Sequence, residues 1–176
     1  MIRPRLLVMA GLILVAAASR LLPHPPNFTP IAALALFGGA HFGGKRWALL
    51  MPLAAMFLSD LVIGLHPLLP VVYGSFAVIV SIGFWLRARR GLIPIAGAVL
   101  ASSLLFFLVT NFGVWALGSL YPKTAQGLLA CYAAAIPFFQ NTLLGDAVYT
   151  VALFGSFRLI ERGFPAVQEP AVAPGR

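Results

Sequence analysis

The chain has 176 residues, of which 61% are hydrophobic and 9% charged, whereas ordinary soluble domains carry about 25% charged residues. This composition excludes a water-soluble globular protein and leaves room for five or six membrane spans of about 20 residues each, without a soluble catalytic domain. The net charge of +8 does not indicate nucleic-acid binding, because the Lys and Arg residues stand at the ends of apolar runs, where they set membrane topology.

The first predicted element is a membrane span over residues 6–22, which follows two arginines and ends in small residues. A signal peptide has the same pattern, so cleavage after Ala18 is an alternative that would remove one span. After the proline-rich loop 23–30, the second span, residues 31–43, reaches only about 20 Å. We expect tilting, bilayer thinning or a broken helix to compensate for this short length.

Four more spans and one surface helix follow. The third to fifth spans cover residues 47–65, 71–86 and 92–117. The next apolar stretch, 127–157, is too long for one straight span and contains Pro137, which interrupts helical hydrogen bonding. We therefore predict a surface helix over 125–136 and a sixth span over 137–157.

The positive charges predict how these spans are oriented. If the N-terminus is cytoplasmic, only Arg20 and Lys123 lie outside. The other ten basic residues then lie inside: Arg3, Arg5, Lys45, Arg46, Arg87, Arg89, Arg90, Arg158, Arg162 and Arg176. This bias predicts six spans with both termini cytoplasmic. We expect a single transmembrane domain, residues 1–163, and a disordered cytoplasmic tail, residues 164–176, which contains three prolines.

Polar residues of the predicted spans gather in the outer half of the bundle and the outer loops, which indicates a polar cup open to the outside. Asp146 lies deepest, and Thr142 and Thr150 share its helical face at intervals of four residues. The predicted substrate-binding residues are Asn27, Thr29, Asp60, His66, Tyr73, Thr110, Asn111, Trp115, Asn141 and Asp146.

The two intramembrane carboxylates admit two interpretations. An unpaired carboxylate in the bilayer is unfavourable by a few kcal/mol, so each should face a ligand or proton site, or a hydrogen-bonding partner within the bundle. For Asp60 the structural alternative is an ion pair with Arg20 across the outer layer. For Asp146 we expect hydrogen bonds to Thr142, Thr150 or Tyr149. We predict different roles for the two: Asp60 ionised in the cup wall, and Asp146 bonded within the bundle.

Catalytic and metal-binding patterns are missing from the sequence. The three histidines have no ligand spacing, and there is no nucleophile elbow, zinc motif or phosphate-binding loop. We predict that the protein is not an enzyme and has no cofactor. Any ATP-driven activity must draw its energy from a partner.

Five segments carry a family resemblance: RLLPHPPNFTP (20–30), SDLVIG (59–64), VYGSF (72–76), TNFGVW (110–115) and NTLLGD (141–146). Together with the six spans, the short second helix and the outer cup, they resemble an uncharacterised bacterial membrane family related to the substrate-binding S components of energy-coupling factor transporters for vitamins. The resemblance implies a six-helix bundle in the bacterial inner membrane. It also implies uptake of a vitamin-like small molecule, with a membrane coupling subunit and cytoplasmic ATPases as partners.

A different class of function is also compatible with the sequence. The protein could be a non-transporting assembly or scaffold protein whose intramembrane polar residues only hold helices together. An outer cavity lined by Asp60, Asn111 and Asn141 would favour transport, whereas a filled core would favour the scaffold.

Overall fold

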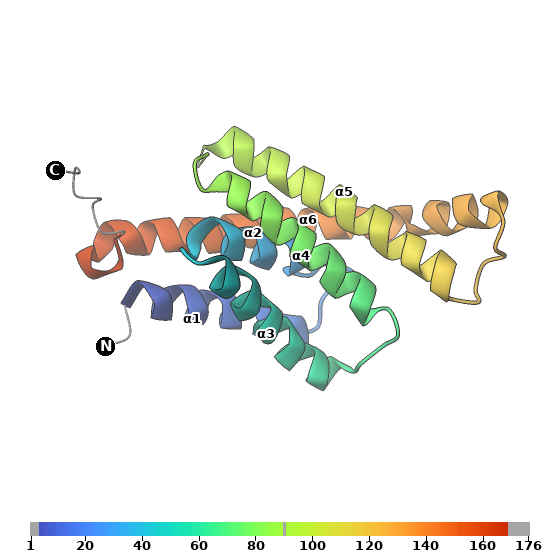
Figure 1. Ribbon diagram of the computed structural model, residues 1–176, viewed down its shortest axis with the longest axis horizontal. Helices are drawn as coiled ribbons and strands as arrows, with labels where there is room; N and C mark the ends of the chain where they lie inside the picture. Colours follow the sequence, from blue (N-terminus) through green and yellow to red (C-terminus); the bar gives the residue numbers. More distant parts are fainter. Residues whose placement is uncertain (1–3, 90, 169–176) are drawn as a thin grey trace.

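The structure, a computed structural model, describes residues 4–89 and 91–168, and within them helices are the only regular secondary structure (Figure 1). The helices run roughly along the long axis of the molecule, and α1 begins at the end where α6 finishes. The elements are α1 (Pro4–Ala18), the 3-10 turn η1 (Ser19–Leu21), α2 (Ile31–His41), α3 (Lys45–Ile63), α4 (Leu69–Leu86), α5 (Leu92–Leu117), α6 (Ala125–Gly163) and the 3-10 turn η2 (Pro165–Val167). The prediction of an all-α protein is confirmed.

Five helical segments among the described residues are long and apolar enough to cross a membrane. They are Pro4–Leu21, which joins α1 to η1, together with α3, α4, α5 and α6. Large apolar side chains cover much of the outer surface, and Leu92 and Ile93 are 84% and 87% exposed. Such a surface is suited to lipid rather than to water. These features are those of a multi-pass helical membrane protein.

The short helix α2 lies at the centre of the bundle, where it packs against α4, α3 and α6. Nine consecutive residues, Ala32 to Ala40, are buried, as expected of a helix that is apolar on every face. Gly39 of α2 and Gly83 of α4 allow these two helices to approach closely, since a Cβ on Gly83 would lie 2.6 Å from the carbonyl oxygen of Leu36. With 11 residues, α2 is only about 16 Å long, and protein surrounds it along this length.

The predicted break at Pro137 is wrong, because α6 is one continuous helix of 39 residues, about 58 Å long. A proline inside a helix removes the hydrogen bond to the carbonyl four residues earlier, here that of Ala133, and its ring crowds that carbonyl, but neighbouring structure can compensate. No separate surface helix forms over residues 125–136. Instead, this segment and the end of α5 extend together beyond the rest of the bundle (Figure 1).

Part of the predicted disordered tail is ordered. Residues 164–168 turn back onto the bundle, where Val167 is buried and its carbonyl oxygen accepts a 2.9 Å hydrogen bond from Arg5 Nη1. Arg5 also pairs with Glu161 of α6. Residues 169–176 lie outside the described part of the chain.

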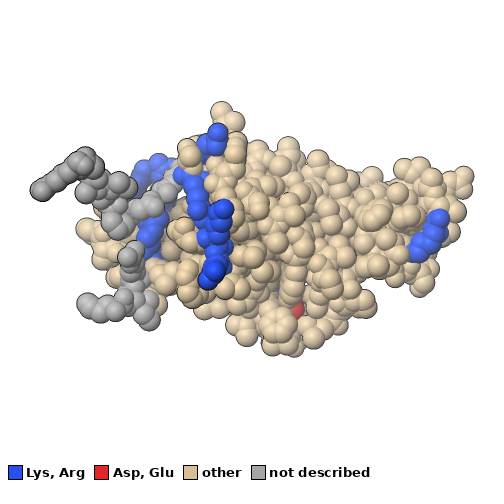
Figure 2. Space-filling model, viewed as in Figure 1, with Lys and Arg blue, Asp and Glu red and all other residues tan. Residues whose placement is uncertain are grey.

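Figure 2 shows basic side chains gathered around one end of the molecule and also at the opposite tip, where the α5–α6 loop lies. We call this end, which contains the starts of α1, α3 and α5 and the ends of α4 and α6, the basic end. Of the residues expected there, Arg3, Arg90 and Arg176 lie outside the described residues. The distribution agrees with the charge pattern of the sequence.

Candidate binding site

Asp60 forms an ion pair with Arg20, the structural alternative that the sequence offered for it. Arg20 Nη2 lies 2.6 Å from Asp60 Oδ1, and the two side chains are 10% and 4% exposed. Tyr73 Oη donates a 2.6 Å hydrogen bond to Asp60 Oδ2, and Arg20 Nη1 donates a 2.5 Å bond to Ser59 Oγ. This cluster joins η1, α3 and α4 at the ends of these elements that lie away from the basic end.

Asp146 caps the start of α2. Its Oδ1 accepts a 3.2 Å hydrogen bond from the backbone N–H of Ala32, and its Oδ2 accepts a 2.7 Å bond from Ser103 Oγ of α5. The first N–H groups of a helix have no partner within it, and Pro30, which precedes α2, has no capping side chain. A carboxylate from α6 therefore satisfies a buried donor and complements the helix dipole.

Arg87 caps the other end of the same helix. Its Nε donates a 2.8 Å hydrogen bond to the carbonyl oxygen of Gly39, and its Nη2 donates a 2.5 Å bond to that of Phe42. A cation at the C-terminus and an anion at the N-terminus are both favourable for a helix dipole. The ends of α2 are thus held by charged side chains from α4–α5 and α6.

The prediction that Asp146 forms hydrogen bonds with Thr142, Thr150 or Tyr149 is wrong. Thr142 donates to the carbonyl of Phe138 on its own helix, at 3.1 Å. Tyr149 accepts a 2.9 Å hydrogen bond from Ser19 of η1. Thr150 Oγ1 has no hydrogen-bond partner among the described residues.

We predict that Asp146→Leu lowers the free energy of unfolding by about 1–3 kcal/mol, because it leaves the Ala32 N–H and the Ser103 hydroxyl buried without an acceptor. Asp146→Asn keeps one side-chain oxygen and should have a smaller effect. Thermal unfolding in detergent measures both, with Ala147→Leu at the exposed neighbouring position as the control. Equal stability of the Leu and Asn variants would contradict a capping role.

The other predicted cup residues bond within loops or to nearby backbone. Asn141 Nδ2 donates a 3.0 Å bond to the carbonyl of Pro26, which fixes the loop before α2 against α6. Thr110, Asn111 and Trp115 donate to the carbonyls of Phe106, Phe107 and Pro122. The backbone carbonyls of Asn27 and His66 accept from Thr29 and Leu69, and Asn27 has a φ of 63°. The binding role of these residues stays a prediction.

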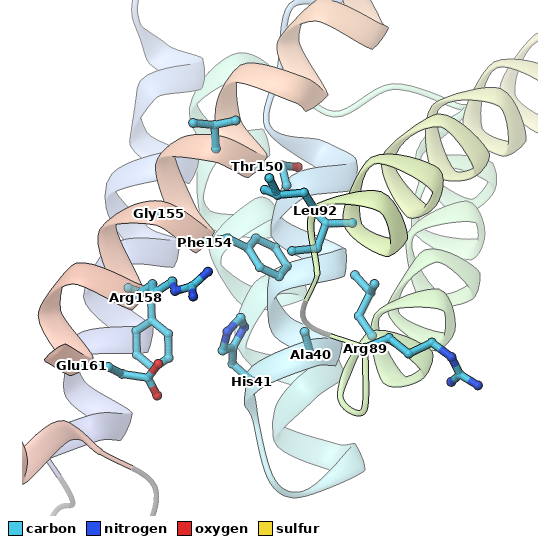
Figure 3. A pocket seen from close by; sticks show the side chains of 13 residues that line it. Ala40, His41, Arg89, Leu92, Thr150, Phe154, Gly155, Arg158 and Glu161 are labelled. Atoms are coloured by element: carbon cyan, nitrogen blue, oxygen red, sulfur yellow. The ribbon is translucent and has the colours of Figure 1, made fainter.

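A cavity of about 360 Å³ lies at the basic end, between the end of α2, the α4–α5 connection and the second half of α6 (Figure 3). It forms because α5 and α6, which contact each other at Ser103 and Asp146 and again toward the α5–α6 loop, diverge toward the basic end (Figure 1). Pockets of 300–1,000 Å³ are typical of small-molecule sites. We call it the basic-end cavity.

Apolar side chains form most of the wall, with a few polar groups between them. Phe154 packs edge-on against Phe37 and His41, with ring centroids 5.5 and 5.0 Å apart. The polar members of the lining are His41, Arg89, Thr150, Arg158 and Glu161. Thr150 is only 2% exposed.

None of the ten predicted binding residues lines the basic-end cavity. They are also absent from the lining of a smaller groove of about 150 Å³ between α1 and α3. Sequence reasoning treated Arg89 and Arg158 only as topology signals. One signal was available: the four-residue spacing of Thr142, Asp146 and Thr150 continues to Phe154 and Arg158. Within residues 4–89 and 91–168, no three His, Cys, Asp or Glu side chains lie together as a metal site.

Comparison with known proteins gives a family but no activity. No functionally curated protein matches the chain, and no solved structure matches it. A family match covers residues 1–167, nearly the whole sequence. The chain therefore belongs to DUF6580, a family of unknown function.

Proposed function

We propose that the protein is a membrane transport component that binds a small organic molecule in the basic-end cavity. The observation that carries this proposal is Thr150, a residue of the cavity lining whose buried hydroxyl has no hydrogen-bond partner in the described part of the chain. Burying an unpaired polar group is unfavourable by about 1–3 kcal/mol. A ligand with a hydrogen-bonding group would remove this penalty.

The distribution of charges supports a particular orientation of the protein in the membrane. We propose six spans, α2 included, in a bacterial inner membrane with both termini cytoplasmic, since basic residues gather at one end. The basic-end cavity then opens toward the cytoplasm, and the Arg20–Asp60–Tyr73 cluster closes the outer half. Capture of a vitamin-like molecule from outside requires a second arrangement in which this outer half opens.

Energy for transport would come from partners. The sequence has no phosphate-binding loop, so we propose that a membrane coupling subunit with cytoplasmic ATPases drives the cycle, as the resemblance to S components implies. The protein itself would supply the ligand site.

A scaffold role is the second candidate, and one specific observation favours it. Asp60, Asn141 and Asp146 bond to groups on other elements of the same chain. Intramembrane polar residues that are used in this way hold helices together and need no ligand.

We predict that Gly155→Leu removes ligand binding. Gly155 lines the basic-end cavity, and a Cβ placed on it meets no atom within 4 Å, so a leucine side chain can occupy the empty space without disturbing the fold. Protein purified in mild detergent should retain a small organic molecule detectable by mass spectrometry, and Gly155→Leu should retain at least about tenfold less, a loss of about 1.4 kcal/mol in binding.

The matched control is Gly97→Leu on α5, which also has open space around its Cβ and lies outside the cavity lining. It should retain the molecule as the unaltered protein does. Equal retention by the Gly155→Leu variant and the unaltered protein, or none by either, would favour the scaffold.

A further inference from the structure

We infer that the ligand of the basic-end cavity is an elongated organic monoanion whose charged group binds Arg158, whose apolar middle lies against Phe154 and whose far end hydrogen-bonds Thr150. This inference rests on the proposed function and adds the chemical class of the ligand.

Three residues of α6 that line the cavity form a row, and they supply the charged, the apolar and the hydrogen-bonding contact. Thr150, Phe154 and Arg158 recur every four residues and line the same cavity, so they lie one above another on one helix face. Eight residues separate the two polar ends, which corresponds to about 12 Å along the helix axis. A ligand that uses both ends must therefore be extended.

No carboxylate of the described residues neutralises the charge of Arg158. Of the four acidic residues, Glu169 lies outside the described residues. Asp60 pairs with Arg20, Glu161 with Arg5, and Asp146 is bonded to Ser103 and α2. The described chain thus offers no carboxylate to Arg158.

Of the two arginines that line the cavity among the described residues, one is directed into it. In Figure 3 the Arg158 side chain extends from α6 toward the middle of the cavity, whereas Arg89 points outward from the opposite rim. The Arg89 guanidinium lies over the Trp85 ring, 4.6 Å from its centroid. A single cation facing an apolar chamber is complementary to a single negative charge.

The middle of the site is apolar. Phe154 is held by Phe37 and His41, and Leu86, Leu92 and Ile95 line the cavity from α4 and α5. A volume of about 360 Å³ admits roughly a dozen non-hydrogen atoms at about 30 Å³ each. This size fits a single short chain or one ring with a side chain, and is too small for a two-chain phospholipid.

Three probes of equal chain length test both ends of the site. They are 10-hydroxydecanoate, decanoate, which lacks the hydroxyl group, and 1,10-decanediol, which lacks the charge. Equilibrium dialysis of each radiolabelled probe against the full chain in nanodiscs of uncharged lipid gives its affinity, with binding to empty nanodiscs subtracted. We expect 10-hydroxydecanoate to bind about tenfold more tightly than the diol and about fivefold more tightly than decanoate.

Two variants and one control variant test which residue causes each difference in affinity. Arg158→Gln should weaken binding of 10-hydroxydecanoate about tenfold and leave the diol unchanged, whereas Arg162→Gln, on the same helix but outside the cavity lining, should change neither. Thr150→Val should remove the preference for 10-hydroxydecanoate over decanoate. Because this preference is a ratio measured on one protein, a partial loss of folded material does not alter it.

Either of two results overturns the inference: equal affinities for the three probes, or equal weakening by Arg158→Gln and Arg162→Gln. If Gly155→Leu still abolishes retention of a co-purified molecule in that case, the proposed function stands and only the ligand class is wrong. If Gly155→Leu has no effect on retention, the proposed function itself fails.

Discussion

Replacing Asp60 by Leu should destabilise the folded protein by about 3–5 kcal/mol, the loss expected when one partner of a buried ion pair is removed. Arg20 would keep its charge in a site where its side chain is only 10% exposed. It could not turn to water without breaking its hydrogen bonds to Ser59 and Met56. Thermal unfolding in detergent, followed by circular dichroism, measures the loss.

The double variant Arg20→Met/Asp60→Leu is the control for this prediction. Removing both charges leaves no unpaired ion, so it should be more stable than Asp60→Leu alone, although the second substitution also removes hydrogen bonds. Tyr73→Phe deletes a single hydrogen bond to Asp60 and should lower stability by about 1 kcal/mol. A double variant less stable than Asp60→Leu would argue against the ion pair as the cause.

Gly83→Ala should lower the free energy of unfolding by about 3 kcal/mol, at the upper end of the usual range for overpacking. The added Cβ would lie 2.6 Å from the carbonyl oxygen of Leu36 and 2.8 Å from the Cα of Gly39. Both are backbone atoms, so a side-chain rotation cannot relieve the overlap, and α2 and α4 would have to move apart.

Gly97→Ala provides the matched comparison for Gly83→Ala. It lies in α5, where an added Cβ meets no atom within 4 Å, and alanine is a better helix former than glycine. This variant should be at least as stable as the unaltered protein in the same unfolding experiment. A similar result for Gly83→Ala would mean that α2 and α4 do not pack as closely as described.

The helices could be predicted from the sequence because their apolar runs are long and end in charges or prolines. The predicted spans over 71–86 and 92–117 correspond closely to α4 and α5. The continuity of α6 was missed because Pro137 breaks the local hydrogen-bond pattern while its effect depends on the surrounding structure. The six-span count stays a prediction, since α2 is shorter than a membrane span.

The partners of the two carboxylates were predictable to different degrees. Arg20 and Asp60 were assigned to the same depth by topology, so the pair could be offered as an alternative. The residues proposed for Asp146 lie on its own helix, where side chains at intervals of four point the same way. Its observed partners, Ser103 and the start of α2, lie on other elements. The rotation of α2 and α5 about their axes decides that contact. The divergence of α5 from α6 decides the basic-end cavity, and neither feature can be read from a single sequence.

The enclosure of α2 has a consequence for the order in which the protein assembles. During synthesis α2 emerges before α4 and α6, and its N-terminal cap, Asp146, comes 114 residues after Ala32. Until then the free N–H groups of α2 need water as their acceptor, and a helix of 11 residues is too short to rest across the bilayer by itself. The most enclosed helix, α2, is therefore synthesised second but receives its N-terminal cap only after α6 has been made. An error in the C-terminal third of the chain would leave α2 unassembled at the membrane surface.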